Sequence, residues 1–136
     1  MLRQMLITVA AFVATAAAAP PPLPPGTPAF ASLKGDPVAG KLAFSVCAMC
    51  HSVVAGQDRM GPSLHGIVGR PSASAPGFHY SPANAGLGVT WTAPLLYQYL
   101  LAPQVFVPGT RMGYAGMKDA QKRADVIAYL ASKPAS

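Results

Sequence analysis

The stretch Cys47-Ala48-Met49-Cys50-His51 decides how the rest of this 136-residue chain is interpreted. Two thiols and an imidazole at this spacing are the attachment signature of a c-type haem. On one turn of helix, each thiol can add across a vinyl group of the same porphyrin, and the imidazole that follows is directed at the iron. The motif therefore predicts one covalently bound haem c.

Two other kinds of site contain a CxxC pair: a redox disulfide and a zinc site. A CxxC pair can form a redox disulfide of the thioredoxin kind, but that motif belongs to a βαβ setting, and the surrounding sequence is not rich in strand signals. Zinc needs four ligands of suitable geometry, and beyond the two cysteines only His51, His65 and His79 remain, without a second closely spaced pair. Because CxxCH is a short pattern, the rest of the chain has to decide between these interpretations.

Chain length and net charge limit the number of domains and the kinds of binding partner. The folded part is expected over residues 30–136, which is room for one domain. Ten Lys and Arg residues face four Asp and no Glu, so the formal net charge is +6. The positive residues are scattered and form no stripe, so we expect no nucleic-acid binding.

The first 29 residues read as targeting and linker sequence. Residues 1–19 combine a basic Arg3, an apolar run and a string of alanines, which is typical of a signal peptide for export. Pro20 disfavours cleavage directly before it, so a cleaved leader and an uncleaved membrane anchor both stay open. Residues 20–29 are rich in proline and predict a stiff polyproline II spacer that holds the domain away from what precedes it.

Three helices are expected around long loops. The first begins after Asp36, an N-cap residue followed by proline, and runs to the CxxCH motif. From 52 to 88 the sequence is rich in Gly, Pro, Ser and Ala, which indicates loops that something rigid must order. A haem would serve that purpose.

The other two helices carry apolar stripes at helical spacing. Thr92 can cap the second, which stops before Pro103. The last helix should run from Met117 or Lys118 to Ser132, and residues 105–112 form an irregular loop between them. The predicted fold class is all-α.

At this point the chain resembles a known family. From Gly35 to Leu130 it is similar to the class I cytochromes c, in particular the mitochondrial cytochrome c and bacterial cytochrome c2 group. The similarity extends beyond CxxCH to these ordered segments: GxxxF at 40–44, GPSLHGIVGR at 61–70, APGFHY at 75–80, AN at 83–84, GVTW at 88–91, PGTRM at 108–112 and RADVIAYL at 123–130. The implied fold packs the two terminal helices against each other, with loops wrapping one haem c.

The resemblance implies a role for each site residue. Cys47 and Cys50 match the thioether cysteines, and His51 and Met112 match the two axial ligands of the iron. Pro62 matches the proline whose carbonyl orients the histidine. The residues expected to bind the propionates or a nearby buried water are Arg70, Tyr80, Asn84, Trp91 and Thr110, while Tyr99 matches a tyrosine close to the methionine sulfur, and Gly40, Phe44 and Tyr129 match the contact between the terminal helices.

With both axial positions taken, no open position remains for substrate, so the expected function is one-electron transfer and not catalysis. The implied partners are a reductase and an oxidase or reaction centre, and the expected form is a monomer in the bacterial periplasm. Alternatives are a fixed or membrane-tethered subunit of a larger redox complex, or a weak peroxidase, which would require Met112 to dissociate. Met117 is a rival ligand, and His65 and His79 are expected to be loop histidines.

One departure from the family concerns the docking surface. Relatives surround the haem edge with lysines, whereas Val46 precedes the first cysteine here, and Gln104 and Val105 occupy a loop that is usually basic. We therefore expect an apolar docking face centred on residues 105–107, with less electrostatic acceleration of association than in the relatives.

Overall fold

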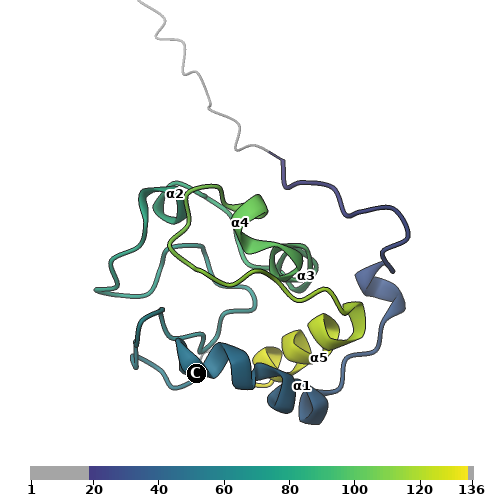
Figure 1. Cartoon of the computed structure of the whole chain (residues 1–136). Helices are drawn as coiled ribbons and strands as arrows, with labels where there is room; N and C mark the ends of the chain where they lie inside the picture. The colour runs from purple at the N-terminus through teal and green to yellow at the C-terminus, as the bar shows by residue number, and fades with distance from the viewer. Residues whose placement is uncertain (1–18, 135–136) are drawn as a thin grey trace, which may run out of the picture.

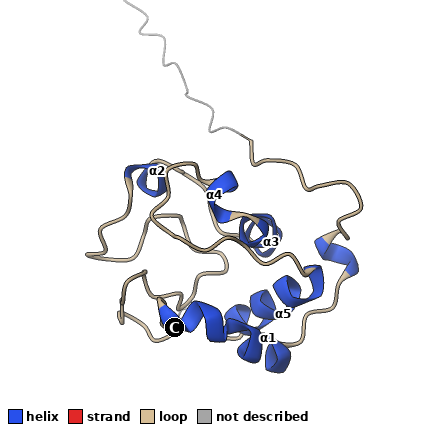
Figure 2. Cartoon of the chain, in the orientation of Figure 1, coloured by secondary structure: helices blue, strands red, loops and turns tan. Residues whose placement is uncertain are grey.

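The computed structural model describes residues 19–134, so the predicted leader, residues 1–18, lies outside the described part of the chain. The elements in order are η1 (Phe30–Ser32), α1 (Pro37–Ala43), η2 (Phe44–Met49), α2 (Pro82–Ala85), α3 (Ala93–Leu101), α4 (Pro103–Phe106) and α5 (Ala120–Ala131), where η denotes a 3-10 helix. Within residues 19–134 the only β-type pairing is an isolated bridge between Pro71 and Thr90. The predicted all-α class is confirmed (Figure 2). No helix in this range has the length and apolar character needed to cross a membrane.

The first and last helices pack against each other at one end of the molecule, as Figure 1 shows. Their close approach depends on Gly40, because a Cβ there would overlap the main-chain carbonyl of Asp125. Beside this crossing the rings of Phe44 and Tyr129 meet with centroids 5.3 Å apart. The side chain of Asp125 also accepts a hydrogen bond from the backbone N–H of Asp36 at 2.9 Å, which ties the start of α1 to α5.

Polar side chains set where the helices begin. The carboxylate of Asp36 accepts from the backbone N–H of Val38 at the start of α1, and Thr92 caps α3 as the sequence predicts. The last helix starts three residues later than the earlier of its predicted starts, because Asp119 caps it by accepting from Lys122 N–H at 3.0 Å. The first helix does not reach the CxxCH motif as one α-helix, since it tightens to the 3-10 helix η2 at Phe44.

The long segment from 52 to 88 is mainly loop and turn, as predicted, with the single-turn helix α2 as its regular part (Figure 2). The side chain of Ser81 begins α2 by accepting from Asn84 N–H at 3.2 Å. The sequence interpretation missed this turn and the short helix α4, both of which begin at a proline. The segment bounds one side of a central cavity described below.

Two expectations about surfaces are wrong. In the proposed docking face only Val105 is exposed; the exposed fractions of Phe106 and Val107 are 8% and 2%, because both side chains belong to the core around α3. The proline-rich segment is not a detached spacer either. Leu23 packs against the core, and the carbonyl of Pro28 accepts a 2.8 Å hydrogen bond from the fully buried Tyr97.

Candidate haem site

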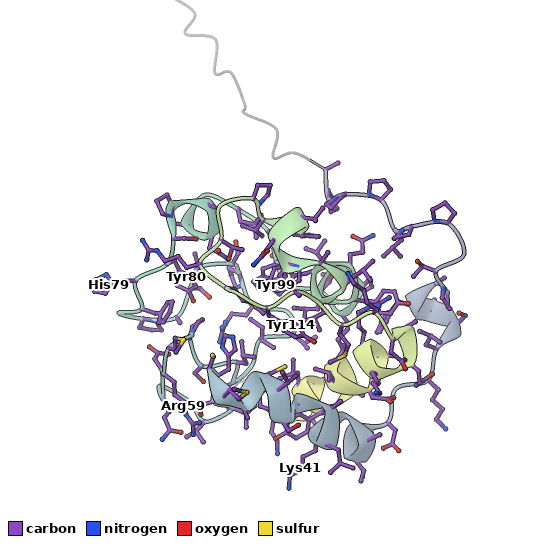
Figure 3. The ribbon with its side chains drawn as sticks, in the orientation of Figure 1. Lys41, Arg59, His79, Tyr80, Tyr99 and Tyr114 are labelled. Atoms are coloured by element: carbon purple, nitrogen blue, oxygen red, sulfur yellow. The ribbon has the colours of Figure 1, made fainter. Side chains whose placement is uncertain are left out.

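A cavity of about 510 Å³ lies in the middle of the molecule, between η2, the long loop, α3 and the segment before α5. Its walls are largely apolar, with Phe44, Ile67, Leu96 and Leu130 among them. The structure brings every sequence-predicted site residue to this one cavity: Cys47, Cys50, His51, Pro62, Arg70, Tyr80, Asn84, Trp91, Tyr99, Thr110 and Met112 all line it. Tyr80, Tyr99 and Tyr114, which are labelled in Figure 3, come from the long loop, from α3 and from the segment before α5, and all three line the cavity.

The two cysteines are held on one tight turn. The backbone N–H groups of Cys50 and His51 both donate to the carbonyl of Cys47, at 3.0 and 2.9 Å. Both thiols are free, and burial raises the pKa of Cys47 to about 11. At neutral pH Cys47 is therefore a thiol, which is the form that adds across a vinyl group, and a poor thiolate nucleophile for disulfide exchange.

The imidazole of His51 is held in place by the backbone of the loop that contains Pro62. Its Nδ1 atom lies 2.7 Å from the carbonyl oxygen of Pro62, and because a carbonyl only accepts, Nδ1 carries the proton. The lone pair is then on Nε2. Burial lowers the pKa of His51, so the ring is neutral and able to bind a metal.

Gly61 is a site residue to which the sequence interpretation gave no role beyond its place in the segment at 61–70. A Cβ at this position would lie 2.7 Å from Nδ1 and 2.9 Å from Nε2 of His51. The absence of a side chain therefore allows the imidazole to lie flat on the backbone. The signal was present in the sequence as a glycine directly before Pro62, but its partner became visible only in three dimensions.

Met112 also lines the cavity, and two polar contacts hold this residue in place. Tyr99 donates its hydroxyl to the sulfur at 2.9 Å, and the Thr110 hydroxyl accepts from the Met112 backbone N–H at 3.2 Å. Burial raises the pKa of Tyr99 to about 12, so this hydroxyl keeps its proton. Met117, the rival ligand candidate, is buried, and its backbone N–H donates to the carbonyl of Leu100 in α3. It is not among the residues that line the cavity.

Arg70 places a guanidinium group on the cavity wall, and one of its N–H groups has no hydrogen-bond partner. Its two terminal nitrogens donate to the carbonyls of Ser63 and His65, at 2.9 and 2.8 Å. Its Nε atom is buried and has no partner. Burial lowers the pKa of Arg70, yet the group stays charged because an arginine starts from a very high value. A buried donor without an acceptor is costly, so this site is built for an acceptor supplied by a ligand, such as a carboxylate.

Polar side chains near Arg70 extend this carboxylate-binding corner. The hydroxyl of Tyr80 accepts from Ala75 N–H at 3.0 Å, which leaves its own proton available to a ligand. The carbonyl oxygen of the Asn84 side chain accepts from Ser81 at 2.9 Å, which turns the amide nitrogen to the other side. Trp91 lines the same cavity and packs against Tyr99 with ring centroids 4.8 Å apart.

The donor set fits a haem with two propionates and fits neither alternative. Within residues 19–134 no group of three or more His, Cys, Asp or Glu side chains could hold a metal ion, which excludes the zinc interpretation for this range. The βαβ setting of a thioredoxin motif is absent from the same range. An apolar cavity with two thiols, a neutral imidazole, a thioether and an unpaired buried guanidinium N–H matches the chemistry of a c-type haem.

Comparison with known proteins agrees with this geometry. Residues 37–133 match the family model for cytochrome c. Over 97 residues the chain is 53% identical to cytochrome c2 of Rhodopila globiformis, covering 71% of this chain and 92% of that protein. Over 98 residues it is 48% identical to cytochrome c type-1 of Ascaris suum, covering 71% and 88%. The structure of cytochrome cH from Methylobacterium extorquens superposes with a TM-score of 0.69 at 40% identity, covering 73% of this chain and all of that one.

The fold and the site define a covalent haem protein of the electron-transfer class. This chain belongs to the cytochrome c family. It carries haem c bound through the cysteines of the CxxCH arrangement and serves electron transport.

Proposed function

We propose that this protein is a mobile one-electron carrier whose haem iron is bound by His51 and Met112. When bound, the haem supplies an iron that takes up and releases one electron. The observation that supports the proposal is that a neutral imidazole and a hydrogen-bonded thioether both line one apolar cavity. The residues of the chain then have to hold this geometry unchanged in both oxidation states.

On the His51 side, the carbonyl of Pro62 accepts a hydrogen bond from Nδ1–H, which leaves the lone pair of Nε2 for the iron. Gly61 supports the face of the ring. This arrangement fixes the tautomer and the rotation of the ligand, so little reorganisation is needed when the charge of the iron changes. A hydrogen-bonded imidazole is also a stronger donor to the metal.

On the Met112 side, a soft thioether stabilises the ferrous state relative to a second hard ligand, so His/Met ligation raises the reduction potential. The Tyr99 hydroxyl draws electron density from the sulfur and adds to this effect. If His51 and Met112 both bind the iron, no ligand position would remain for oxygen or peroxide, so the proposed role is electron transfer without catalysis at the iron.

The propionates are proposed to lie at the corner formed by Arg70, Tyr80 and Asn84, with Trp91 and Thr110 beside it. A buried carboxylate is stable only when it is paired or hydrogen-bonded. The unpartnered Nε of Arg70 supplies such a partner. The apolar walls around the rest of the cavity exclude water, which keeps the environment of the iron constant.

The proposed location is the bacterial periplasm, where the carrier passes electrons as a monomer between a reductase and an oxidase or reaction centre. Export rests on the leader-like residues 1–19, and residues 1–18 lie outside the described structure. If the leader is uncleaved, the same domain works as a tethered or fixed subunit. Intact mass of the native protein separates the two, because a free N-terminus near residue 19 excludes the tether.

A spectroscopic comparison tests the ligand assignment. The ferric holoprotein should show the weak far-red absorption of iron–sulfur ligation, and a pyridine haemochrome should report haem c. Met112→Ala should lose the far-red band, and Met117→Ala, the matched control, should keep it. Loss of the band in Met117→Ala with retention in Met112→Ala would overturn the assignment.

A further inference from the structure

The proline-rich N-terminal segment is part of the folded domain, although it lies outside the residues that match the cytochrome c family. That match covers residues 37–133 and leaves this segment out. Leu23, Phe30 and Leu33 pack against the core, and Figure 1 shows the segment passing beside α3 and α5 on its way to α1. We call residues 19–33 the N-terminal strap. This chain therefore carries a packed element in addition to the part that matches the family.

Tyr97 of α3 is the residue to which the strap is attached. Its hydroxyl donates to the carbonyl of Pro28 at 2.8 Å, and the centroids of the Tyr97 and Phe30 rings are 5.4 Å apart. The exposed fraction of Tyr97 is 0%, and this side chain does not line the haem cavity. Leu96 and Tyr99 on the same helix do line it. Helix α3 therefore contacts the strap through one residue and the cavity through its neighbours.

Arg123 of α5 connects Tyr97 to the chain just before α5. Its guanidinium carbon lies 4.2 Å from the centroid of the Tyr97 ring, which is a cation–π contact. One of its terminal nitrogens donates to the carbonyls of Met117 and Lys118, at 2.7 and 3.0 Å. The side chain is fully buried, and its other two nitrogens have no hydrogen-bond partner. The ring and the two carbonyls are therefore the groups that stabilise this buried cation.

The contacts of Tyr97 reach Met112 by two short paths. On α3, Tyr99 donates to the Met112 sulfur from a position two residues beyond Tyr97. After Met112, the chain is held by Arg123, which donates to the two carbonyls before α5, and by the Met117 N–H, which donates to a carbonyl of α3 at 2.8 Å. Cation–π contacts and hydrogen bonds are stronger where water is excluded. By covering Tyr97, the strap therefore strengthens the contacts that hold the loop of Met112.

We propose that the N-terminal strap is a positioning element for Met112, which acts through Tyr97 and Arg123 to keep the thioether in place to bind the haem iron. The proposal rests on the proposed ligation by His51 and Met112 and adds the segment that stabilises it. None of the strap residues lines the cavity, so their effect on the ligand is indirect. Added imidazole can bind the iron only when Met112 has left, so its apparent affinity reports how firmly the thioether is held.

The test compares four ferric holoproteins: the wild type, Phe30→Ala, the conservative variant Phe30→Tyr and the control Asp36→Ala. The control removes the side-chain cap of α1, a carboxylate that lies outside the strap and does not line the cavity. Loss of a helix cap and loss of an aromatic pair lower overall stability by similar amounts, so the control shows what a merely structural change does. Imidazole is titrated against loss of the far-red band, and exchange of the Met117 amide hydrogen is followed by NMR.

Phe30→Ala should bind imidazole about fivefold more tightly than the wild type, because one aromatic pair is lost. Its Met117 amide should exchange faster by a similar factor. Phe30→Tyr and Asp36→Ala should match the wild type in both measurements. An unchanged imidazole affinity or an unchanged Met117 exchange in Phe30→Ala would overturn the positioning role, and so would equal changes in Asp36→Ala.

Tyr97→Phe tests the strap without removing a ring, since it loses only the hydrogen bond to Pro28. Its imidazole affinity should rise about threefold, and an unchanged affinity would overturn the proposal. The far-red band of the wild type separates this proposal from the one on which it rests. If the band is present and the strap variants bind imidazole as the wild type does, the strap has no positioning role and ligation by Met112 stands. A wild type without the band would overturn both.

Discussion

The hydroxyl of Tyr99 donates a hydrogen bond to the sulfur of Met112 across 2.9 Å, although the two residues lie 13 positions apart on a helix and a loop. A donor aimed at the thioether withdraws electron density and favours the reduced iron. We expect Tyr99→Phe to lower the reduction potential by about 40 mV, which corresponds to roughly 1 kcal/mol for one hydrogen bond in a one-electron couple. Redox titration of the holoprotein measures it. An unchanged potential with the far-red band retained would show that the contact has no electronic effect.

The same tyrosine predicts how stability responds to alkaline pH. Burial raises the pKa of Tyr99 from 10.0 to about 12 in the folded state. Between these values the unfolded chain releases the proton and the folded chain keeps it, so the stabilisation present below pH 10 is lost as the pH rises toward 12. Denaturant unfolding at several pH values should show this fall. Tyr99→Phe should fall less steeply, and an identical slope would contradict the prediction.

Gly61 is expected to be intolerant of a side chain. Gly61→Ala places a Cβ against the His51 ring, where backbone and imidazole must both shift, and overpacking of this kind costs about 1–3 kcal/mol. Gly86→Ala is the matched control, because Gly86 does not line the cavity and a Cβ there would make an ordinary contact, 3.4 Å from the carbonyl oxygen of Pro82. Equilibrium unfolding of the two holoproteins gives the comparison. Equal stabilities would mean that the ring can move aside without cost.

Arg70 should be irreplaceable by lysine. The guanidinium reaches the carbonyls of Ser63 and His65 and still has a buried N–H for a carboxylate, a fork that a single ammonium cannot reproduce. We expect Arg70→Lys to lower the free energy of unfolding by about 1–3 kcal/mol. Arg111→Lys, at an exposed position, should change it little. If only Arg111→Lys lowered the free energy of unfolding strongly, the cation that stabilises the fold would be Arg111 and not Arg70.

Removal of the haem should unfold the chain. A cavity of about 510 Å³ would cost roughly 12 kcal/mol at ~24 cal/mol per Å³. That is as large as the whole stability of a typical domain, about 5–15 kcal/mol. Cys47→Ala/Cys50→Ala, purified without haem, should therefore lose most of its helical far-UV circular dichroism.

Cys50→Ala is the control for haem removal, since one thioether bond through Cys47 can retain the haem. It should keep its helical signal. A folded double variant without haem would show that the loops around the cavity collapse onto each other and do not depend on the cofactor.

Local features of the sequence determined the chemistry and the ends of the helices. The CxxCH spacing specifies attachment because both thiols and the imidazole lie within one turn, and Asp36 and Thr92 define helix starts because a cap acts within three residues. The placement of Met112 beside Tyr99 followed from the resemblance to a known family, since no local rule pairs a loop methionine with a helix tyrosine.

Tertiary packing decided which apolar side chains are exposed and which are buried. Val105, Phe106 and Val107 are all apolar, yet the turn formed by α4 and its C-cap residue Val107 buries the last two side chains and leaves the first exposed. The proline-rich segment has no periodicity that would reveal its contact with Tyr97. These outcomes are set by contacts between segments distant in the chain, and hydrophobicity alone does not specify which apolar residue finds a partner.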